Sequence, residues 1–324
     1  MELGYFGKLP SRADFVRYNA TAPVYRLFDE WIQGGLRQSL SGQFAEYDRA
    51  YSAAGPSSFL YYPSEGAGPL IGVIQPSTDQ AGRKYPFYVS SGLDDYDLSE
   101  SPTSALPFTF SPLFDAAASL IVEATEHGAT TAMITEQIRL INERSSFSMS
   151  GSGAMEAAYS DTTFGDLCTA IWGGFFESRK YAAFKNVLDL LVSLRDQGQP
   201  RFSYGLEFPL ASGPLMQTSA AFWLDVCSRL LGMKYFKPTL FINHGYGLDE
   251  HPPSMYLYFS HPPGIAFLNI AQALYKHDSL YTLDSIGNRN PAELALSIPA
   301  DFGLVIESAD LPLSQTLDGF GTAV

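Results

Sequence analysis

The stretch Ser58–Ser90 reads SFLYYPSEGAGPLIGVIQPSTDQAGRKYPFYVS and holds three short runs rich in aromatic and branched residues. These runs, at Ser58–Tyr62, Leu70–Gln75 and Tyr85–Ser90, predict three β-strands, because such side chains favour the extended backbone of a sheet. Glycine and proline lie between the runs, where they allow the chain to reverse its direction sharply. The stretch therefore predicts a small meander of strands that follow one another in sequence.

Helical patterns alternate with further strands on both sides of this meander. The spacing of apolar residues predicts helices at 23–37, 113–124, 133–141, 184–194, 220–231 and 265–275. Further strands are predicted at 201–208, 239–243, 255–260 and 302–306. Interleaved helices and strands are typical of an α/β fold. We expect a three-layer α/β/α sandwich, whose sheet is mixed because turns link the early strands.

A polar segment suggests how the chain is divided. Residues 145–153 read SSFSMSGSG, a small and unpatterned composition that is typical of a flexible connection. We therefore expect an amino-terminal α/β domain at residues 1–144, a flexible connection at 145–160 and a carboxy-terminal α/β region at 161–324. The two structured parts are expected to pack together as one body.

Composition narrows the classes of function. The 34 acidic and 20 basic residues give a formal charge of −14, which on average repels nucleic acid and anionic membrane surfaces. No apolar run approaches the roughly 18 residues that a membrane-spanning helix requires, and the first residues lack a signal-peptide pattern. Cys168 and Cys227 are expected to be buried, reduced thiols. These features predict a cytoplasmic protein that is not inserted in a membrane.

The sequence holds no complete catalytic or metal-binding pattern. Asp301-Phe302-Gly303 matches a kinase tripeptide, but the glycine-rich loop and the His-Arg-Asp loop of kinases are missing. The histidines lack the i, i+4 spacing of a helical metal site, although His244 and His251 flank Asp249-Glu250 and leave a cation in that loop as an alternative. We expect no enzyme activity, metal or cofactor.

Two segments are distinctive without being catalytic in pattern. The first, GYFGKLPSRADFV at residues 4–16, reads as a loop held in one shape by its proline, with Asp14 able to accept backbone hydrogen bonds or to pair with Lys8 or Arg12. The second, residues 72–87, reads as a strand, a polar turn and a second strand. Asp79 and Arg83 are expected to meet across that turn, either shaping the loop only or binding a partner directly.

These segments resemble the two motifs of the TagF family. The matching residues of the first motif are Gly7, Lys8, Leu9, Pro10, Asp14, Phe15 and Val16. The matching residues of the second motif are Pro76, Ser77, Asp79, Gly82, Arg83 and Pro86. Trp31 stands where the family usually carries a tryptophan, whereas Ala13 stands where it usually carries glycine. The loop at Ala13 is therefore expected either to avoid a positive φ or to tolerate a strain of roughly 1 kcal/mol.

The resemblance implies a non-enzymatic accessory factor of bacterial type VI secretion. It implies a post-translational regulator, and a repressor in particular, that binds a forkhead-associated scaffold component in the cytoplasm. We expect Lys8, Asp14 and Arg83 to contact the partner and the other motif residues to shape the surface. The acidic charge of the chain favours a basic patch on that partner. Two alternatives stay open: a small hydrolase or nucleotide-binding factor that uses Asp14, Asp79 and Arg83, and a structural baseplate-associated protein.

Overall fold

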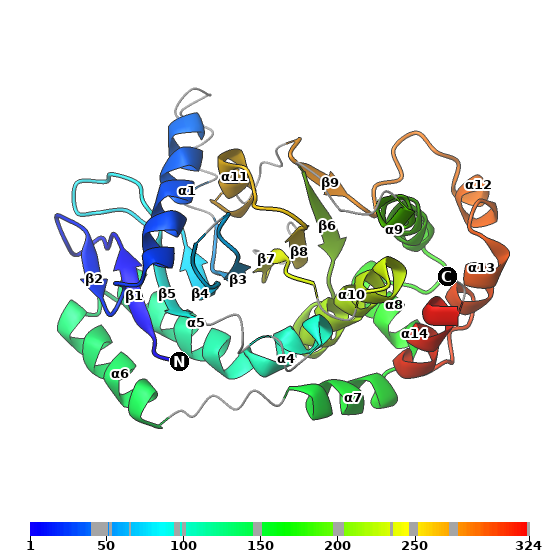
Figure 1. The fold of residues 1–324 in the computed structure, drawn as a ribbon, viewed down its shortest axis with the longest axis horizontal. Helices are drawn as coiled ribbons and strands as arrows, with labels where there is room; N and C mark the ends of the chain where they lie inside the picture. Colours follow the sequence, from blue (N-terminus) through cyan, green and yellow to red (C-terminus); the bar gives the residue numbers. More distant parts are fainter. Residues whose placement is uncertain are drawn as a thin grey trace.

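A computed structural model describes residues 1–39, 51, 54–64, 66–93, 98, 102–144, 151–196, 204–233, 236–245, 252–271 and 278–322. Within these residues, nine strands form one mixed sheet with the order β2-β1-β5-β4-β3-β7-β8-β6-β9 (Figure 1). Neighbouring strands are antiparallel except for β6 and β9, which run parallel. The strands are β1 (Gly4–Gly7), β2 (Val16–Tyr18), β3 (Ser57–Tyr61), β4 (Leu70–Gln75), β5 (Phe87–Gly92), β6 (Gly205–Pro209), β7 (Thr239–Asn243), β8 (Ser254–Tyr258) and β9 (Leu280–Thr282).

Helices cover both faces of this sheet (Figure 1). α1 (Pro23–Ser39) and α11 (Phe267–Ala271) lie on one face, and α5 (Ser111–Thr125) and α10 (Met216–Leu231) lie on the other. The remaining α-helices are α4 (Leu106–Thr109), α6 (Thr131–Arg144), α7 (Ser152–Asp161), α8 (Phe164–Trp172), α9 (Ser178–Asp196), α12 (Pro291–Leu296), α13 (Ala300–Ile306) and α14 (Leu313–Thr322). Short 3₁₀ turns are η1 (Thr103–Ala105), η2 (Gly213–Leu215) and η3 (Gly264–Ala266). The three-layer α/β/α sandwich with a mixed sheet is therefore confirmed.

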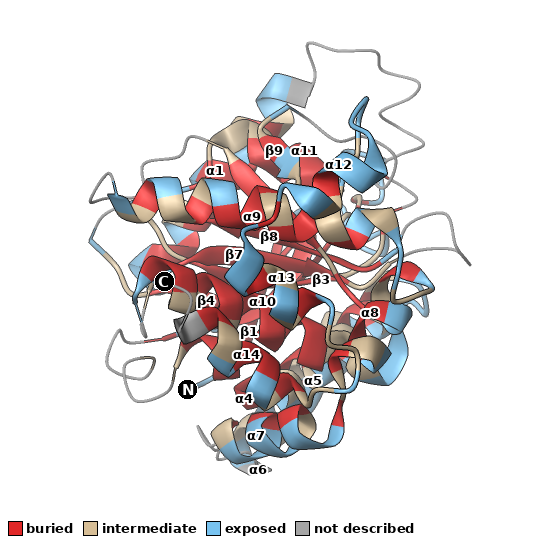
Figure 2. Cartoon of the chain, turned by 90° about the vertical axis from the view of Figure 1, so that its right-hand side faces the viewer, coloured by how far each residue is buried: buried red, intermediate tan, exposed pale blue. Residues whose placement is uncertain are grey.

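Two hydrophobic cores, one on each face of the sheet, hold the layers together. Figure 2 shows that buried residues gather in the sheet and on the inner faces of the helices. The alternation of side chains along a strand explains the division: in β3, Phe59 packs under α1, whereas its neighbour Leu60 belongs to the core under α5 and α10. Cys168 and Cys227 are free and buried in that second core, and burial raises the pKa of both thiols.

The sheet joins strands from the earlier and the later part of the sequence. β3 pairs with β7, so that Phe59 lies opposite Phe241. Trp31 strengthens this junction, because its ring lies 5.5 Å from that of Phe241 and its Nε1 donates to the carbonyl oxygens of Pro262 at 3.0 Å and Pro263 at 3.2 Å. The tryptophan expected from the family motif is thus a buried connection between α1 and the later part of the chain.

Three predicted segments differ from the structure. Residues 302–306 form part of helix α13 and not a strand, because Phe302 and Ile306 are buried one helical turn apart while Leu304 is exposed. Of the expected flexible connection at 145–160, residues 145–150 lie outside the described part, and Ser152–Asp161 is helix α7, which buries Met155 and Tyr159. The first motif begins in strand β1, which the prediction of a loop did not include.

Among the described residues, no single helix has the length and apolar character needed to cross a membrane. One pair of segments bent by 50°, Thr103–Thr109 with Ser111–Thr125, meets these criteria jointly, by length and composition only.

Candidate functional site

The two motifs form neighbouring loops at one end of strands β1, β4 and β5. The first loop, residues 8–15, connects β1 to β2, and the second loop, residues 76–86, connects β4 to β5 (Figure 1). The loops meet because β1 and β5 are paired, with Gly7 opposite Phe87. Gly7 has a φ of 137°, and a Cβ atom there would lie 2.1 Å from the carbonyl oxygen of Pro86. Glycine at this position therefore permits the close approach of the two motifs.

Asp79 joins the two loops through a buried carboxylate, which is 2% exposed. Its Oδ2 accepts hydrogen bonds from Lys8 Nζ at 2.9 Å and from Arg83 Nε at 2.6 Å. Its Oδ1 accepts from the backbone N–H groups of Ala81 at 3.0 Å and Arg83 at 2.9 Å. We call Lys8, Asp79 and Arg83 the Asp79 clamp. The expected meeting of Asp79 with Arg83 is confirmed.

The protonation state of Asp79 follows from these contacts. Burial by itself raises the pKa of a carboxyl group, because it disfavours the charged form. The hydrogen bonds from Lys8, Arg83 and Ala81 outweigh that effect and hold the pKa of Asp79 well below its usual range. Asp79 is thus ionised at neutral pH and has its acceptor sites occupied by these donors.

Further bonds fix the loops to each other. The backbone N–H of Gln80 donates to the carbonyl oxygen of Arg12 at 2.8 Å. The NH2 group of Arg83 donates to the carbonyl oxygen of Ala13 at 2.7 Å. Gly82 has a φ of 78°, a left-handed conformation that closes the second loop. Ala13 avoids such a conformation, since Asn19 is the non-glycine residue with a positive φ among those the structure describes.

The exposed residues of both loops form one face, which we call the two-loop surface. Phe15 is 44% exposed, and its ring lies 5.4 Å from that of Phe6 and 4.8 Å from that of Tyr85. Lys8 Nζ lies 5.1 Å from the centre of the Phe15 ring. The members of the surface are Pro10, Ser11, Arg12, Ala13, Asp14, Phe15, Gln80, Ala81, Gly82 and Arg83.

The three residues expected to contact a partner have different surroundings here. Lys8 is 7% exposed and donates to Asp79, so its ammonium group lies inside the clamp. Asp14 is exposed, and its Oδ1 accepts from the backbone N–H of Phe15 at 2.8 Å. Arg83 belongs both to the clamp and to the surface, because its side chain remains 62% exposed.

Three further motif residues, Leu9, Pro76 and Ser77, lie on the inner side of the loops. Leu9 is fully buried in the core. The carbonyl oxygen of Ser77 accepts from the Tyr51 hydroxyl at 3.2 Å and from the backbone N–H of Tyr85 at 3.1 Å. Pro76 is partly buried beside it. Leu9 and Ser77 are thus buried behind the exposed part of the loops.

Charge is a feature of this face that sequence reasoning missed. Five basic residues stand against two carboxylates in residues 8–17 and 76–86, which gives a local excess of three positive charges in a chain of charge −14. A local count along each motif would have found it. The basic residues are Lys8, Arg12, Arg17, Arg83 and Lys84, and the acidic ones are Asp14 and Asp79.

Acid–base chemistry has little support at this face. A hydrolase that used Asp14, Asp79 and Arg83 would need a carboxyl group that exchanges a proton near neutral pH. Asp79 has its pKa lowered instead, and Arg83 is bonded to it. Among the described residues, no three His, Cys, Asp or Glu side chains gather as metal ligands, while Asp249, Glu250 and His251 lie outside that part.

A small polar cluster lies where β3 pairs with β7. Ser58 Oγ lies 2.9 Å from His244 Nε2, and both residues line a pocket of about 80 Å³ between β3, β7, α5 and α10. Burial lowers the pKa of His244, while the charge of Asp115 acts in the opposite direction. In the same pocket, Gln217 donates to Ser111 Oγ at 2.7 Å. Each of these two hydrogen-bonded pairs joins two different segments that line the pocket.

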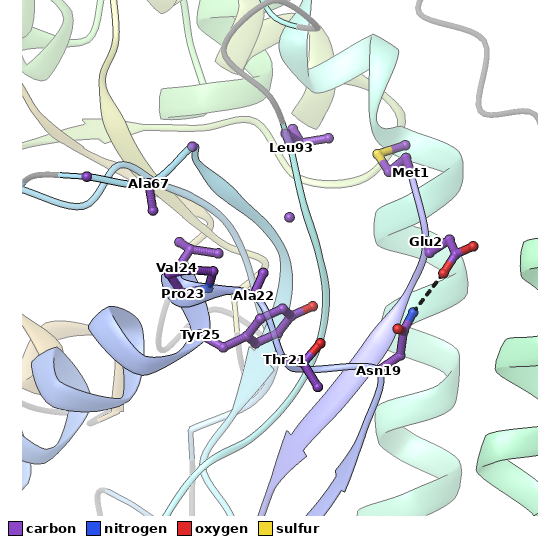
Figure 3. A pocket seen from close by; sticks show the side chains of 13 residues that line it. Met1, Glu2, Asn19, Thr21, Ala22, Pro23, Val24, Tyr25, Ala67 and Leu93 are labelled. Carbon is purple, nitrogen blue, oxygen red and sulfur yellow. Dashed lines mark hydrogen bonds between the residues drawn. The ribbon is translucent and has the colours of Figure 1, made fainter.

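A wider pocket of about 470 Å³ lies at the opposite end of β1 and β2 from the two loops (Figure 3). Glu2, Asn19 and the first turn of α1 line it, and the amide of Asn19 donates to Glu2 at 3.3 Å (Figure 3). The pocket contains none of the motif residues.

The comparison with known protein families agrees with the motifs. The family described as "TagF N-terminal domain, Type VI secretion system-associated" matches residues 4–141, which include both loops and Trp31. No curated protein matches the chain. A crystal structure of PA0076 from Pseudomonas aeruginosa PAO1 is similar with a TM-score of 0.47 and 16% identity, over 86% of this chain and 98% of that one. Residues 4–141 therefore belong to the TagF N-terminal domain family, which is described as type VI secretion system-associated.

Proposed function

We propose that the protein is a non-enzymatic accessory regulator of type VI secretion, and a repressor in particular. In this proposal it acts in the cytoplasm, where its two-loop surface binds a forkhead-associated scaffold component and keeps that component from the apparatus. The observation that carries the proposal is the convergence of both family motifs on one exposed face, held rigid by the buried Asp79 clamp.

The physical properties of the face suit protein recognition. Arginine and aromatic side chains dominate the binding energy of many protein interfaces, and the two-loop surface exposes Arg12, Phe15 and Arg83. The cross-bonds from Gln80 and Arg83 to the first loop order both loops before a partner arrives. Pre-ordering reduces the entropy that binding costs. The clamp thus supports a docking face more readily than a reaction centre.

Calorimetry with the purified scaffold tests this placement. Phe15→Ser removes the exposed ring of the two-loop surface, and we expect it to weaken binding by about tenfold or more. Phe176→Ser is the matched control, because Phe176 is 79% exposed and lies outside both loops. It should leave the affinity unchanged. In cells, Phe15→Ser should release the restraint on secretion.

Two results would count against the proposal. If both variants bind the scaffold like the natural chain and secretion control is unchanged, the two-loop surface is the wrong face. If the natural chain instead co-sediments in fixed ratio with the assembled apparatus, a structural baseplate role replaces the regulatory one.

A further inference from the structure

The two-loop surface differs in charge from the rest of the molecule. The chain carries 14 more acidic than basic residues, yet the two loops and the first residues of β2 carry three more basic than acidic ones. Lys8 and Asp79 are buried against each other, so they cancel inside the clamp. The exposed charged residues of the two-loop surface are Arg12 and Arg83 against Asp14, and Arg17 is exposed in β2, which follows the first loop. A partner that approaches this surface interacts mainly with these local charges, because charges more than about 8–10 Å away are screened at physiological salt.

Arg83 is fixed in a geometry that suits a carboxylate. Its Nε donates to Asp79 and its NH2 group donates to the carbonyl oxygen of Ala13. These bonds orient the planar guanidinium and leave its NH1 group, with one hydrogen of NH2, without an acceptor in the described part of the chain. Since the side chain is 62% exposed, that end of the guanidinium is accessible to a ligand. A guanidinium held in this way binds a carboxylate with less loss of side-chain entropy.

Arg12 adds a second cation to the two-loop surface. Its backbone carbonyl oxygen accepts from Gln80, so the main chain of Arg12 is tied to the second loop. Its side chain is exposed and makes no hydrogen bond or ion pair within the described residues. Arg12 is therefore a free cation on an ordered backbone.

Phe15 supplies an exposed apolar side chain on the same two-loop surface. Its ring rests on Phe6 and Tyr85, which limits its movement, and 44% of the residue remains exposed. An exposed aromatic ring on the same surface as two arginines fits a ligand that alternates carboxylate and apolar side chains.

We propose that the two-loop surface binds an acidic segment of a partner protein, whose carboxylates pair with Arg12 and Arg83 and whose apolar side chain packs on Phe15. This inference rests on the proposed docking role of the surface and names the chemistry of the segment it takes. The charge of the whole chain predicts a basic patch on the partner, whereas the charge of this surface predicts an acidic one.

Fluorescence anisotropy with three labelled peptides tests the charge of the ligand. The probe alternates glutamate with leucine, and its two counterparts carry glutamine or lysine in place of glutamate. The glutamate peptide should bind the full chain at least about tenfold more tightly than the glutamine peptide at low salt, and added salt should reduce that difference. Equal binding of the glutamate and glutamine peptides, or tighter binding of the lysine peptide, would overturn the proposal.

Matched charge reversals test whether the glutamate peptide binds at the two-loop surface. Arg12→Glu changes the two-loop surface, and Arg37→Glu makes the same change of charge at another exposed arginine, near the end of α1. Arg12→Glu should weaken the glutamate peptide by about tenfold, and Arg37→Glu by less than about twofold. Similar losses in both variants would show a general effect of net charge and would refute the assigned site. Thermal unfolding of each variant confirms that it is folded.

The scaffold, measured with the same variants, separates this inference from the proposed function. One outcome is that Phe15→Ser weakens scaffold binding, whereas Arg12→Glu and added salt leave it unchanged. This outcome would support the docking role of the surface and would refute the proposal that it binds an acidic segment. Conversely, binding of the glutamate peptide that depends on Arg12, without binding of the scaffold, would keep the acidic segment and refute the assigned partner.

Discussion

Lys8→Met separates a buried clamp residue from a residue that contacts a partner. Lys8 was expected to contact the partner, but its Nζ lies 2.9 Å from Asp79 Oδ2 and the residue is 7% exposed. Methionine keeps an unbranched stem of similar length, so the substitution removes the ammonium group with little change in packing.

The size of the effect follows from the contacts. A hydrogen bond that involves a charged group contributes about 1.5–3 kcal/mol to the free energy of unfolding. The acceptor of Lys8 keeps its bonds to Arg83 and to two backbone N–H groups, so we expect the lower part of this range, about 1.5–2 kcal/mol. With 324 residues, the entropy of unfolding is about 0.7 kcal/mol/K, and Tm should therefore fall by about 2–3 °C.

Calorimetric unfolding at neutral pH measures this shift, with Arg12→Met as the control on the exposed side of the same loop. Arg12→Met should change the free energy of unfolding by less than about 0.5 kcal/mol, because Arg12 is exposed and its side chain makes no hydrogen bond or ion pair with another described residue. Scaffold affinity, measured well below Tm, should fall in Arg12→Met and persist in Lys8→Met. An unchanged Tm in Lys8→Met, together with a loss of scaffold binding, would refute the assignment of Lys8 to the clamp.

Three further predictions concern the core and pH. Trp31→Phe removes the N–H that bonds Pro262 and Pro263 and should lower the free energy of unfolding by about 1–3 kcal/mol; an unchanged thermal midpoint would contradict this. Because the pKa of Asp79 is lowered in the folded state, its contribution is present above the ordinary carboxyl pKa of about 3.9 and is lost as pH falls through the lower folded value. Urea unfolding between pH 2 and 6 should show a shallower acid limb in Asp79→Asn, and parallel limbs would disprove the coupling. Burial lowers the pKa of His244, so the unfolded chain takes up a proton first, near pH 6.5, and the free energy of unfolding should fall as pH drops through that region. His244→Gln should flatten this slope in urea unfolding, leaving a part from His261, whose pKa is also lowered by burial; an identical slope in both proteins would show that His244 does not contribute.

Local patterns were sufficient for much of the fold. The strand at Leu70–Gln75 and the helix that begins at Pro23 were predicted from side-chain preference and apolar spacing, which act over a few neighbouring residues. The pairing of Asp79 with Arg83 was also accessible, because the two residues lie four positions apart in one turn. The two TagF motifs could be identified for the same reason, since each is continuous in sequence.

Local patterns failed where the identity of a residue depends on a contact with a segment distant in sequence. Strand β1 begins and ends with Gly4 and Gly7, and glycine is a poor strand former by propensity. A Cβ at Gly4 would lie 2.5 Å from the carbonyl oxygen of Tyr18, so only the pairing of β1 with its neighbours explains the choice. Helix α13 was mistaken for a strand because a short apolar run fits either period until its buried face is known.

By itself, the sequence determined the α/β class, most helices and central strands, and the family of the amino-terminal domain. Only the tertiary structure decided that Lys8 is buried against Asp79, 71 positions away, and that Arg12 and Arg83 lie on one exposed surface of an acidic chain. The physical reason is that desolvation and Coulomb attraction depend on distance in space. The paired strands β1 and β5 set that distance, and sequence separation does not report it.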